Sequence, residues 1–110
     1  MTEGRVLGQI TIDGEQVDLV LLRYADGRPA VRAVVAATGE PWGTLSVNPG
    51  PDTALPEGTI AVKTWSENAS WWQAAAMSGM FMITGQTLRL GNFDGVAPVW
   101  KILDFAGGVS

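Results

Sequence analysis

The side chains that could carry chemistry are carboxylates, hydroxyls and a group of tryptophans. The 110 residues include neither cysteine nor histidine, which excludes disulfides and cysteine-ligated zinc and removes the commonest general base. Asp13 and Glu15 are spaced closely enough to form a carboxylate pair, but acids in turns and at strand ends are usually solvated. The sequence has no phosphate-binding glycine loop, nucleophile elbow or calcium loop. We therefore expect no enzyme activity, no cofactor and no metal.

Glu67 and Asn68 are the strongest polar candidates for a site. They stand at the start of a predicted helix, between Trp65 and the adjacent Trp71 and Trp72. A carboxylate at this place gains from the helix dipole and can cap the first turn. It can also bind a ligand or exchange a proton, so both interpretations stay open.

Tryptophan is abundant, with five residues in the chain. Trp71 and Trp72 would project about 100° apart on a helix, so a single sheet face cannot easily cover both. We expect Trp72 to pack on the sheet with Ala69 and Ala76. Trp71 is expected to lean toward solvent, where an exposed tryptophan is a favoured interface anchor. The predicted interaction residues are Trp65, Glu67, Asn68, Trp71 and Trp72.

Residues 65 to 79 form the one predicted helix. Asn68 can cap its first free N–H groups, and Ser70 with Gln73 offers a second start as a capping box. Gly79 suits the left-handed position that closes a helix. The apolar arc of this helix is wider than one buried face needs, so part of it is available to a partner.

Short strands flank the helix on both sides. Asp-Gly pairs at residues 13–14 and 26–27 are strong hairpin signals, and they predict a meander of four antiparallel strands. The predicted strands are Arg5 to Ile12, Gln16 to Tyr24, Pro29 to Ala37, Trp42 to Asn48, Thr59 to Thr64, Phe81 to Thr84, Thr87 to Leu90 and Val96 to Leu103. The expected fold class is α+β, in a single domain over residues 1–110. A twisted antiparallel sheet, made of the N-terminal meander plus C-terminal strands, carries one short helix packed on it.

Two of these strands carry positional signals. In the strand from Trp42 to Asn48, Leu45 and Val47 share one face while Thr44, Ser46 and Asn48 lie on the other, so we expect this strand to be half-exposed. Pro98 cannot donate a ladder hydrogen bond, which predicts an edge position for the last strand.

Charge and hydropathy limit the kinds of partner and the cellular location that we expect for the protein. The net charge is −4 and Lys and Arg form no cluster, which disfavours direct binding to nucleic acid. The chain has no apolar stretch of membrane-spanning length and no basic-then-apolar leader. We therefore expect a cytoplasmic protein without a membrane association.

Several short motifs resemble one protein family. They are Thr-Gly-Glu-Pro at 38–41, Leu-Ser-Val-Asn at 45–48, and the run from Leu55 that ends in Trp-Ser-Glu-Asn at 65–68. The order resembles the core of a family of small uncharacterised proteins from plasmids, phages and other mobile elements. The resemblance spans roughly residues 24 to 80. The chain departs from the family at Gly50-Pro51, and again after Asn68, where the tryptophan pair replaces a Gly-aliphatic start. The resemblance implies a host-interaction or accessory role in bacteria and carries no established activity.

Together these features lead us to expect a non-catalytic accessory protein of a mobile element that binds another protein. The finer expectation is an inhibitor of a host defence system, such as a nucleic-acid-binding CRISPR or restriction complex. A face bearing Trp71, with the loop of residues 49–58 beside it, would occlude a basic surface. Two alternatives stay open. One is a ligand-binding module in which Trp65, Trp71, Trp72 and Glu67 line a pocket for a cationic or aromatic molecule. The other is a homodimer through the spare helix face.

Overall fold

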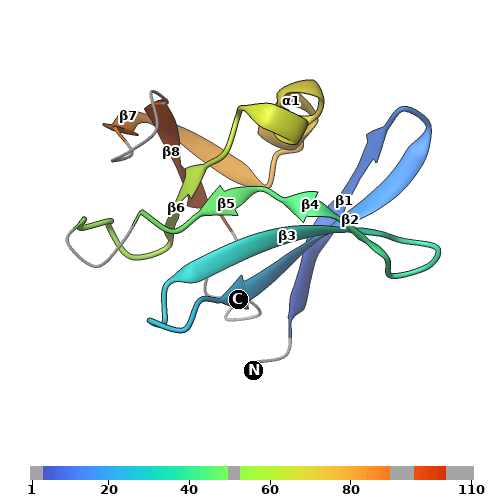
Figure 1. Cartoon of the computed structure of the whole chain (residues 1–110), viewed down its shortest axis with the longest axis horizontal. Helices are drawn as coiled ribbons and strands as arrows, with labels where there is room; N and C mark the ends of the chain where they lie inside the picture. Colours follow the sequence, from blue (N-terminus) through green and yellow to red (C-terminus); the bar gives the residue numbers. More distant parts are fainter. Residues whose placement is uncertain (1–3, 50–52, 90–95, 104–110) are drawn as a thin grey trace.

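The computed structural model describes residues 4–49, 53–89 and 96–103. It contains two four-stranded antiparallel sheets, one short α-helix and one 3-10 helix (Figure 1). The predicted α+β class, with a twisted antiparallel sheet and one short helix, is confirmed. The elements are β1 (Arg5–Ile12), β2 (Glu15–Arg23), β3 (Pro29–Val35), β4 (Pro41–Thr44), β5 (Ser46–Val47), β6 (Thr59–Val62), η1 (Ser66–Ser70), α1 (Trp72–Ala76), β7 (Phe81–Arg89) and β8 (Val96–Ile102).

The first sheet is the predicted meander, with strand order β1-β2-β3-β4. Asp13 and Gly14 join β1 to β2 with φ values of 51° and 82°. Two successive positive φ values are those of a type I′ turn, whose twist matches the twist of the flanking strands. The hairpin expected from Asp-Gly at this place is therefore confirmed.

The second sheet has the order β5-β6-β8-β7, so β8 lies between two other strands. The edge position predicted from Pro98 is wrong. Two features of the neighbouring strands accommodate this proline. Pairing between β6 and β8 runs from Val99 to Lys101 and ends before Pro98, and β7 is bulged between Ile83 and Thr87, directly before the residue that pairs with Pro98. A bulge is one of the few places where a strand tolerates proline.

One residue joins the two sheets. The predicted strand from Trp42 to Asn48 is divided at Leu45 into β4, in the first sheet, and β5, in the second. The Leu45 N–H donates to the carbonyl oxygen of Val31 on β3 at 2.9 Å, and the Leu45 carbonyl accepts from the N–H of Lys63, which follows β6, at 2.8 Å. Leu45 therefore belongs to the hydrogen-bond ladders of both sheets.

Ser46, next to this junction, is also buried. Its Oγ accepts a hydrogen bond from the Val31 N–H at 2.9 Å and pairs with the hydroxyl of Tyr24 at 2.8 Å. Burial raises the pKa of the Tyr24 phenol. The strand is half-exposed as expected, since Thr44 and Asn48 are exposed and Leu45 is buried. The solvent position expected for Ser46 is wrong, because the chain changes sheets here and its backbone needs polar partners inside.

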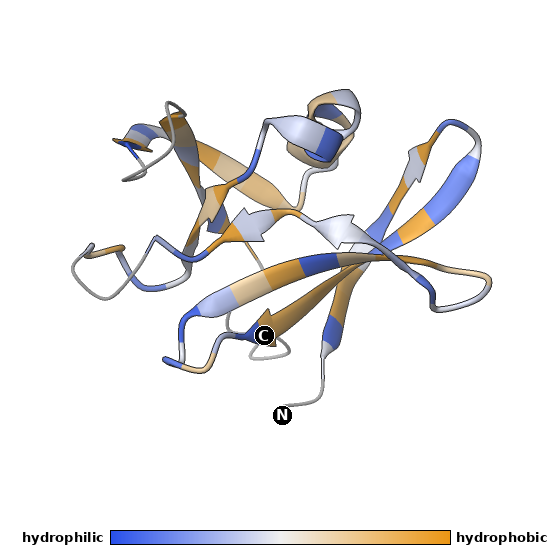
Figure 2. Ribbon diagram, in the orientation of Figure 1, coloured by the Kyte–Doolittle hydropathy of each residue, from blue (hydrophilic) through white to orange (hydrophobic). Residues whose placement is uncertain are grey.

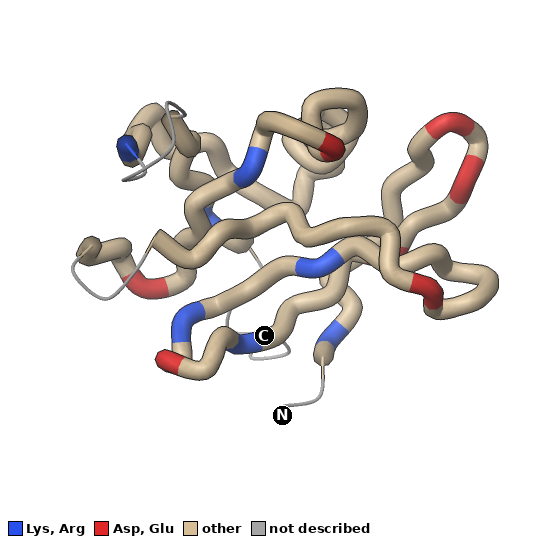
Figure 3. The backbone as a smooth tube through the Cα atoms, in the orientation of Figure 1, with Lys and Arg blue, Asp and Glu red and all other residues tan. Residues whose placement is uncertain are grey.

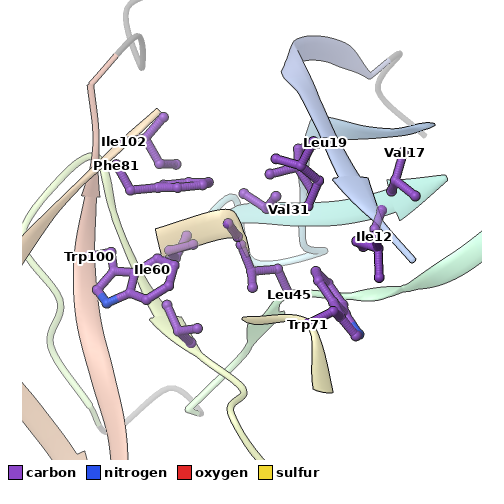
Figure 4. Close-up of a cluster of buried hydrophobic side chains, with 14 residues drawn as sticks. Ile12, Val17, Leu19, Val31, Leu45, Ile60, Trp71, Phe81, Trp100 and Ile102 are labelled. Atoms are coloured by element: carbon purple, nitrogen blue, oxygen red, sulfur yellow. The ribbon is translucent and has the colours of Figure 1, made fainter. Parts of the chain in front are cut away.

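The core lies between the two sheets, where Leu45 and Val31 face Trp100, Phe81 and Ile60 (Figure 4). The rings of Phe81 and Trp100 are 5.5 Å apart between centroids and tilted by 44°, an arrangement that aromatic pairs favour. The core is therefore made by both sheets together.

The open side of the two-sheet assembly, between β1 and β7, is covered by α1, which contacts both strands (Figure 1). Met80, between α1 and β7, lies over Gly8 of β1, where an added Cβ would come within 2.8 Å of the Met80 sulfur. Gly8 therefore allows the segment before β7 to pack directly on β1.

Leu45→Ala is expected to destabilise the protein by about 2 to 5 kcal/mol, because it leaves a cavity at the junction of both sheets. Urea denaturation followed by tryptophan fluorescence measures this loss. Leu103→Ala is the matched control, since Leu103 is 55% exposed and its truncation should change stability by about 0.5 kcal/mol or less. Equal effects of the two substitutions would contradict the role given to Leu45.

Candidate functional site

The predicted helix over residues 65 to 79 is divided into η1 and α1. The division lies at Trp71, whose φ of −135° and ψ of −8° are not helical. The residues that precede the two helices, Trp65 and Trp71, make no side-chain capping hydrogen bond, so the caps expected from Asn68 and Ser70 are wrong. Gly79 has the expected left-handed conformation, with φ of 84°.

Asn68 is fully buried and fastens η1 to the two sheets. Its Nδ2 donates to the carbonyl of Thr44, at the end of β4, at 2.8 Å. The same nitrogen donates to the carbonyl of Lys63, after β6, at 3.0 Å. Its Oδ1 has no hydrogen-bond partner among the described residues. Asn68 thus holds the chain beside the Leu45 junction, and its role in the fold is that of a buried donor.

The solvent position expected for Trp71 is wrong, whereas Trp72 packs against the core together with Ala76, as expected. Trp71 is in the core with 3% of its surface exposed (Figure 4), whereas Trp72 is half-buried. The Trp72 ring lies 6.2 Å from that of Trp100 and is tilted by 47°. Ala69, which was expected to pack with Trp72, is exposed. These differences follow from the break between η1 and α1, because a continuous helix would fix other directions for these side chains.

Trp65 is separated from the other two tryptophans. It packs against Ala61 and Ala97, in a cluster distinct from the core that contains Trp71 and Trp72. Ala61 and Ala97 alternate with the core-facing Ile60 and Trp100 along their strands, so this cluster lies on the outer face of the second sheet. The predicted pocket of Trp65, Trp71, Trp72 and Glu67 is therefore not formed.

The structure does place Glu67 and Trp71 in one shallow cleft, together with a tryptophan that the site prediction missed. The cleft has a volume of about 310 Å³ and is lined by Pro41, Trp42, Glu67, Ser70 and Trp71. Trp42 is half-buried. Strand alternation could not have placed it, because a bulge interrupts the pairing of β4 at Trp42, and Trp42 packs against the core.

Glu67 carries the charge of this cleft. Its Oε2 accepts a hydrogen bond at 2.9 Å from the Nζ of Lys63, four residues earlier in the chain. Figure 3 shows a basic and an acidic segment close to each other beside the helices. The hydrogen bond from Lys63 lowers the pKa of the Glu67 carboxyl below its ordinary value. The carboxyl is therefore ionised at neutral pH, and 59% of the side chain is exposed.

The loop of residues 49–58, where it is described, lies against the turn between β2 and β3. Arg28 donates from Nη2 to the carbonyl of Thr53, and Leu55, Glu57 and Arg23 line a hollow of about 340 Å³ between the loop and this turn. No described loop residue lines the Trp42 cleft. The expectation that this loop flanks Trp71 is therefore wrong, whereas Gly50-Pro51 of the resemblance lies outside the described residues.

A second candidate surface surrounds β7, the edge strand of the second sheet. Six large apolar side chains are exposed in the described ranges. Val6 lies on β1 and Met77 ends α1, whereas the other four lie on β7 or are bonded to β7 or to the residue just before it. These four, which we call the β7 surface, are Met82, Ile83, Val96 and Leu103. The half of β7 nearest α1 is accordingly apolar in Figure 2.

Two residues of the β7 surface lie outside β7 and are bonded to it or to the residue before it. Val96 pairs with Arg89 of β7, and the Leu103 N–H donates to the carbonyl of Met80, just before β7, at 3.0 Å. Met82 is 47% exposed and Ile83 is 59% exposed. Met82 and Ile83 are successive strand residues and point to opposite faces, and Val96 lies at the far end of β7. The exposed apolar side chains therefore surround the edge strand and do not form one patch.

Comparison with protein-family models, with curated proteins and with solved structures finds no match for this chain. Within the described ranges, no helix has both the length and the apolar character that crossing a bilayer requires. The same residues contain no group of three or more acidic side chains arranged to hold a metal ion. The residues of the cleft and of the β7 surface therefore provide the basis for assigning a function.

Asn68→Asp is expected to destabilise the protein by about 3 to 5 kcal/mol near neutral pH, because a carboxylate would face two carbonyl oxygens without solvent. Burial raises the pKa of such a carboxyl in the folded state. The loss should therefore shrink as the pH falls through that raised pKa, where the carboxyl becomes protonated. Denaturation curves at several pH values measure this, with Ser70→Ala as an exposed control. A small loss that does not vary with pH would contradict the buried-donor role.

The Glu67 carboxyl is expected to titrate below the ordinary range of glutamate, and Lys63→Met should raise its pKa toward that range. A carboxyl ¹³C NMR titration measures both values. Because the folded-state pKa is the lower one, the contribution of the ion pair to stability is present at neutral pH and disappears as pH falls through it. An unchanged Glu67 titration in the Lys63 variant would show that another group causes the shift.

Proposed function

We propose that this chain is a non-catalytic accessory protein of a bacterial mobile element, and that it acts by binding another protein through the β7 surface. The finer role that we propose is inhibition of a host defence complex. The resemblance of residues 24 to 80 to proteins of plasmids and phages supports the proposed origin in a mobile element. The single observation that supports the binding activity is that β7 is an edge strand among the described residues and carries the exposed apolar side chains Met82 and Ile83.

A free strand edge presents unpaired backbone N–H and C=O groups that can pair with another chain. Proteins usually protect such an edge with charged residues, proline, a short strand or a bulge. β7 has nine residues, of which only Arg89 is charged, and its one protective feature is the bulge at residues 84–86. The regular part from Phe81 to Ile83 therefore remains suited to receive an added strand.

The charges beside β7 indicate the chemistry of the partner. Arg89 ends β7, and Lys101 pairs with Met82. The described residues 77–89 and 96–103 contain no aspartate or glutamate, whereas Asp94 and Asp104 of the sequence lie just outside these ranges. An extended segment that alternates apolar side chains with carboxylates would satisfy both the apolar surface and these cations. The proposed partner therefore carries an extended strand of apolar and acidic composition. Binding to β7 occludes that strand, and this inhibits the partner.

Selection from a display library of random peptides tests this proposal without a known partner. The enriched peptides should be extended, apolar and acidic, and they should bind the protein more weakly at high salt. Ile83→Asp should weaken their binding by at least about tenfold, since it places a carboxylate on the surface. Val6→Asp is the matched control, because Val6 is 55% exposed on the edge strand β1 and should leave binding unchanged.

Hydrogen exchange then locates the bound peptide. Protection of the β7 amides in the complex supports strand addition, and protection confined to other elements would overturn it. Light scattering of the protein alone gives a further outcome. If two copies associate and protect the β7 amides of each other, the surface serves self-association and the heterologous partner is wrong.

A further inference from the structure

The cleft beside η1 combines two kinds of side chain that recognise positive charge. Pro41 and Trp42 come from β4, Glu67 and Ser70 come from η1, and the buried Trp71 closes the inner end. A Cβ added at Gly43 would lie 3.4 Å from the Trp71 ring, at van der Waals distance. Residue 43 of β4 therefore lies directly against the indole of Trp71.

The carboxylate of Glu67 has capacity for a second donor. A carboxylate offers about four lone-pair positions, and Lys63 Nζ occupies one of them at 2.9 Å. The side chain of Lys63 is only 25% exposed, against 59% for Glu67. Glu67 therefore presents its remaining acceptor capacity to solvent at the cleft, while the lysine is held closer to the protein.

An indole face attracts a cation through its quadrupole, with tryptophan the strongest of the aromatic side chains. The Glu67 carboxylate on the same cleft, already paired with Lys63, adds a charge-assisted hydrogen bond to a second cation. The volume of about 310 Å³ suits a single ammonium or guanidinium group with its methylene neighbours. Anionic ligands, including nucleotides, lack the positive charge that the indole face and the carboxylate of this cleft attract.

From this arrangement we propose that the cleft of Pro41, Trp42, Glu67, Ser70 and Trp71 binds an organic cation, with Trp42 stacking on its face and Glu67 pairing with its charge. The cation is either a free quaternary or methylated ammonium compound or the side chain of a basic residue on another protein. This site is separate from the β7 surface and does not depend on the function proposed for it.

A titration with choline, followed in two-dimensional NMR spectra by the Trp42 indole N–H, tests the site directly. The neutral control is 3,3-dimethyl-1-butanol, which has the shape of choline without its charge. Choline should produce a saturable shift of the Trp42 indole and of the Glu67 carboxyl, and the alcohol should not. Equal responses to the two molecules would overturn the proposal, and so would no saturable response to any cation tested.

Two substitutions separate the contributions of charge and ring. Glu67→Gln keeps the fold, because the side chain is largely exposed, and should weaken binding by roughly tenfold. Glu40→Gln removes another exposed carboxylate that does not line the cleft, and should leave binding unchanged. Trp42→Leu should also weaken binding, while Trp42→Phe retains an aromatic face and part of the affinity. Full affinity in both Glu67→Gln and Trp42→Leu would place the cation elsewhere.

The source of the cation is decided by comparing probes of the same chemistry. Choline represents a free small molecule, and short peptides that contain one arginine or one trimethyllysine represent a side chain of a partner. Tighter binding of a peptide identifies a protein ligand, and tighter binding of choline identifies a free one. Both results support the cleft as a cation site, provided that Glu67→Gln weakens the binding observed.

Discussion

The backbone of Leu45 is the constraint on which the rest of the structure depends. Its N–H is bonded to β3 and its carbonyl to the residue after β6, so two sheets that would otherwise only stack are joined through one ladder. A buried backbone group left without a partner costs about as much as a lost hydrogen bond. The position of each sheet is therefore fixed relative to the other at this point, and the core between them has one shape.

Asn68 fixes the position of η1 relative to the junction of the two sheets. Because its amide bonds to Thr44 and to Lys63, η1 is held against the ends of strands from both sheets. This placement turns Trp71 inward and leaves Glu67 facing solvent beside Trp42. The cleft is thus a consequence of how the sheets are joined, and it needs no further element to hold its walls.

Local patterns in the sequence were sufficient for most strands. Asp13-Gly14 gave the first hairpin because the turn chemistry acts within four residues, and the meander followed from the strands on either side. The wrong predictions concern residues whose burial is determined by hydrogen bonds to groups outside their own element. Ser46 is buried because Val31 and Tyr24 need its hydroxyl, and Trp71 is buried because Asn68 bonds to carbonyls that lie 24 and 5 residues away. Neither partner is visible in a pattern of neighbouring residues, and the same is true of the contact that brings Trp42 to Glu67.

The place of β8 in the second sheet has a consequence for the order of folding. β8 lies between β6 and β7, so these two earlier strands have no partner on that side until the last described strand has been synthesised. The first sheet is built from neighbouring hairpins and can form while the chain is still growing. The second sheet has to wait for a pairing between residues about 40 apart, such as Thr59 with Lys101. During that interval β7 is open on both edges, and a chaperone or a binding partner would meet it in a form that the finished protein no longer presents.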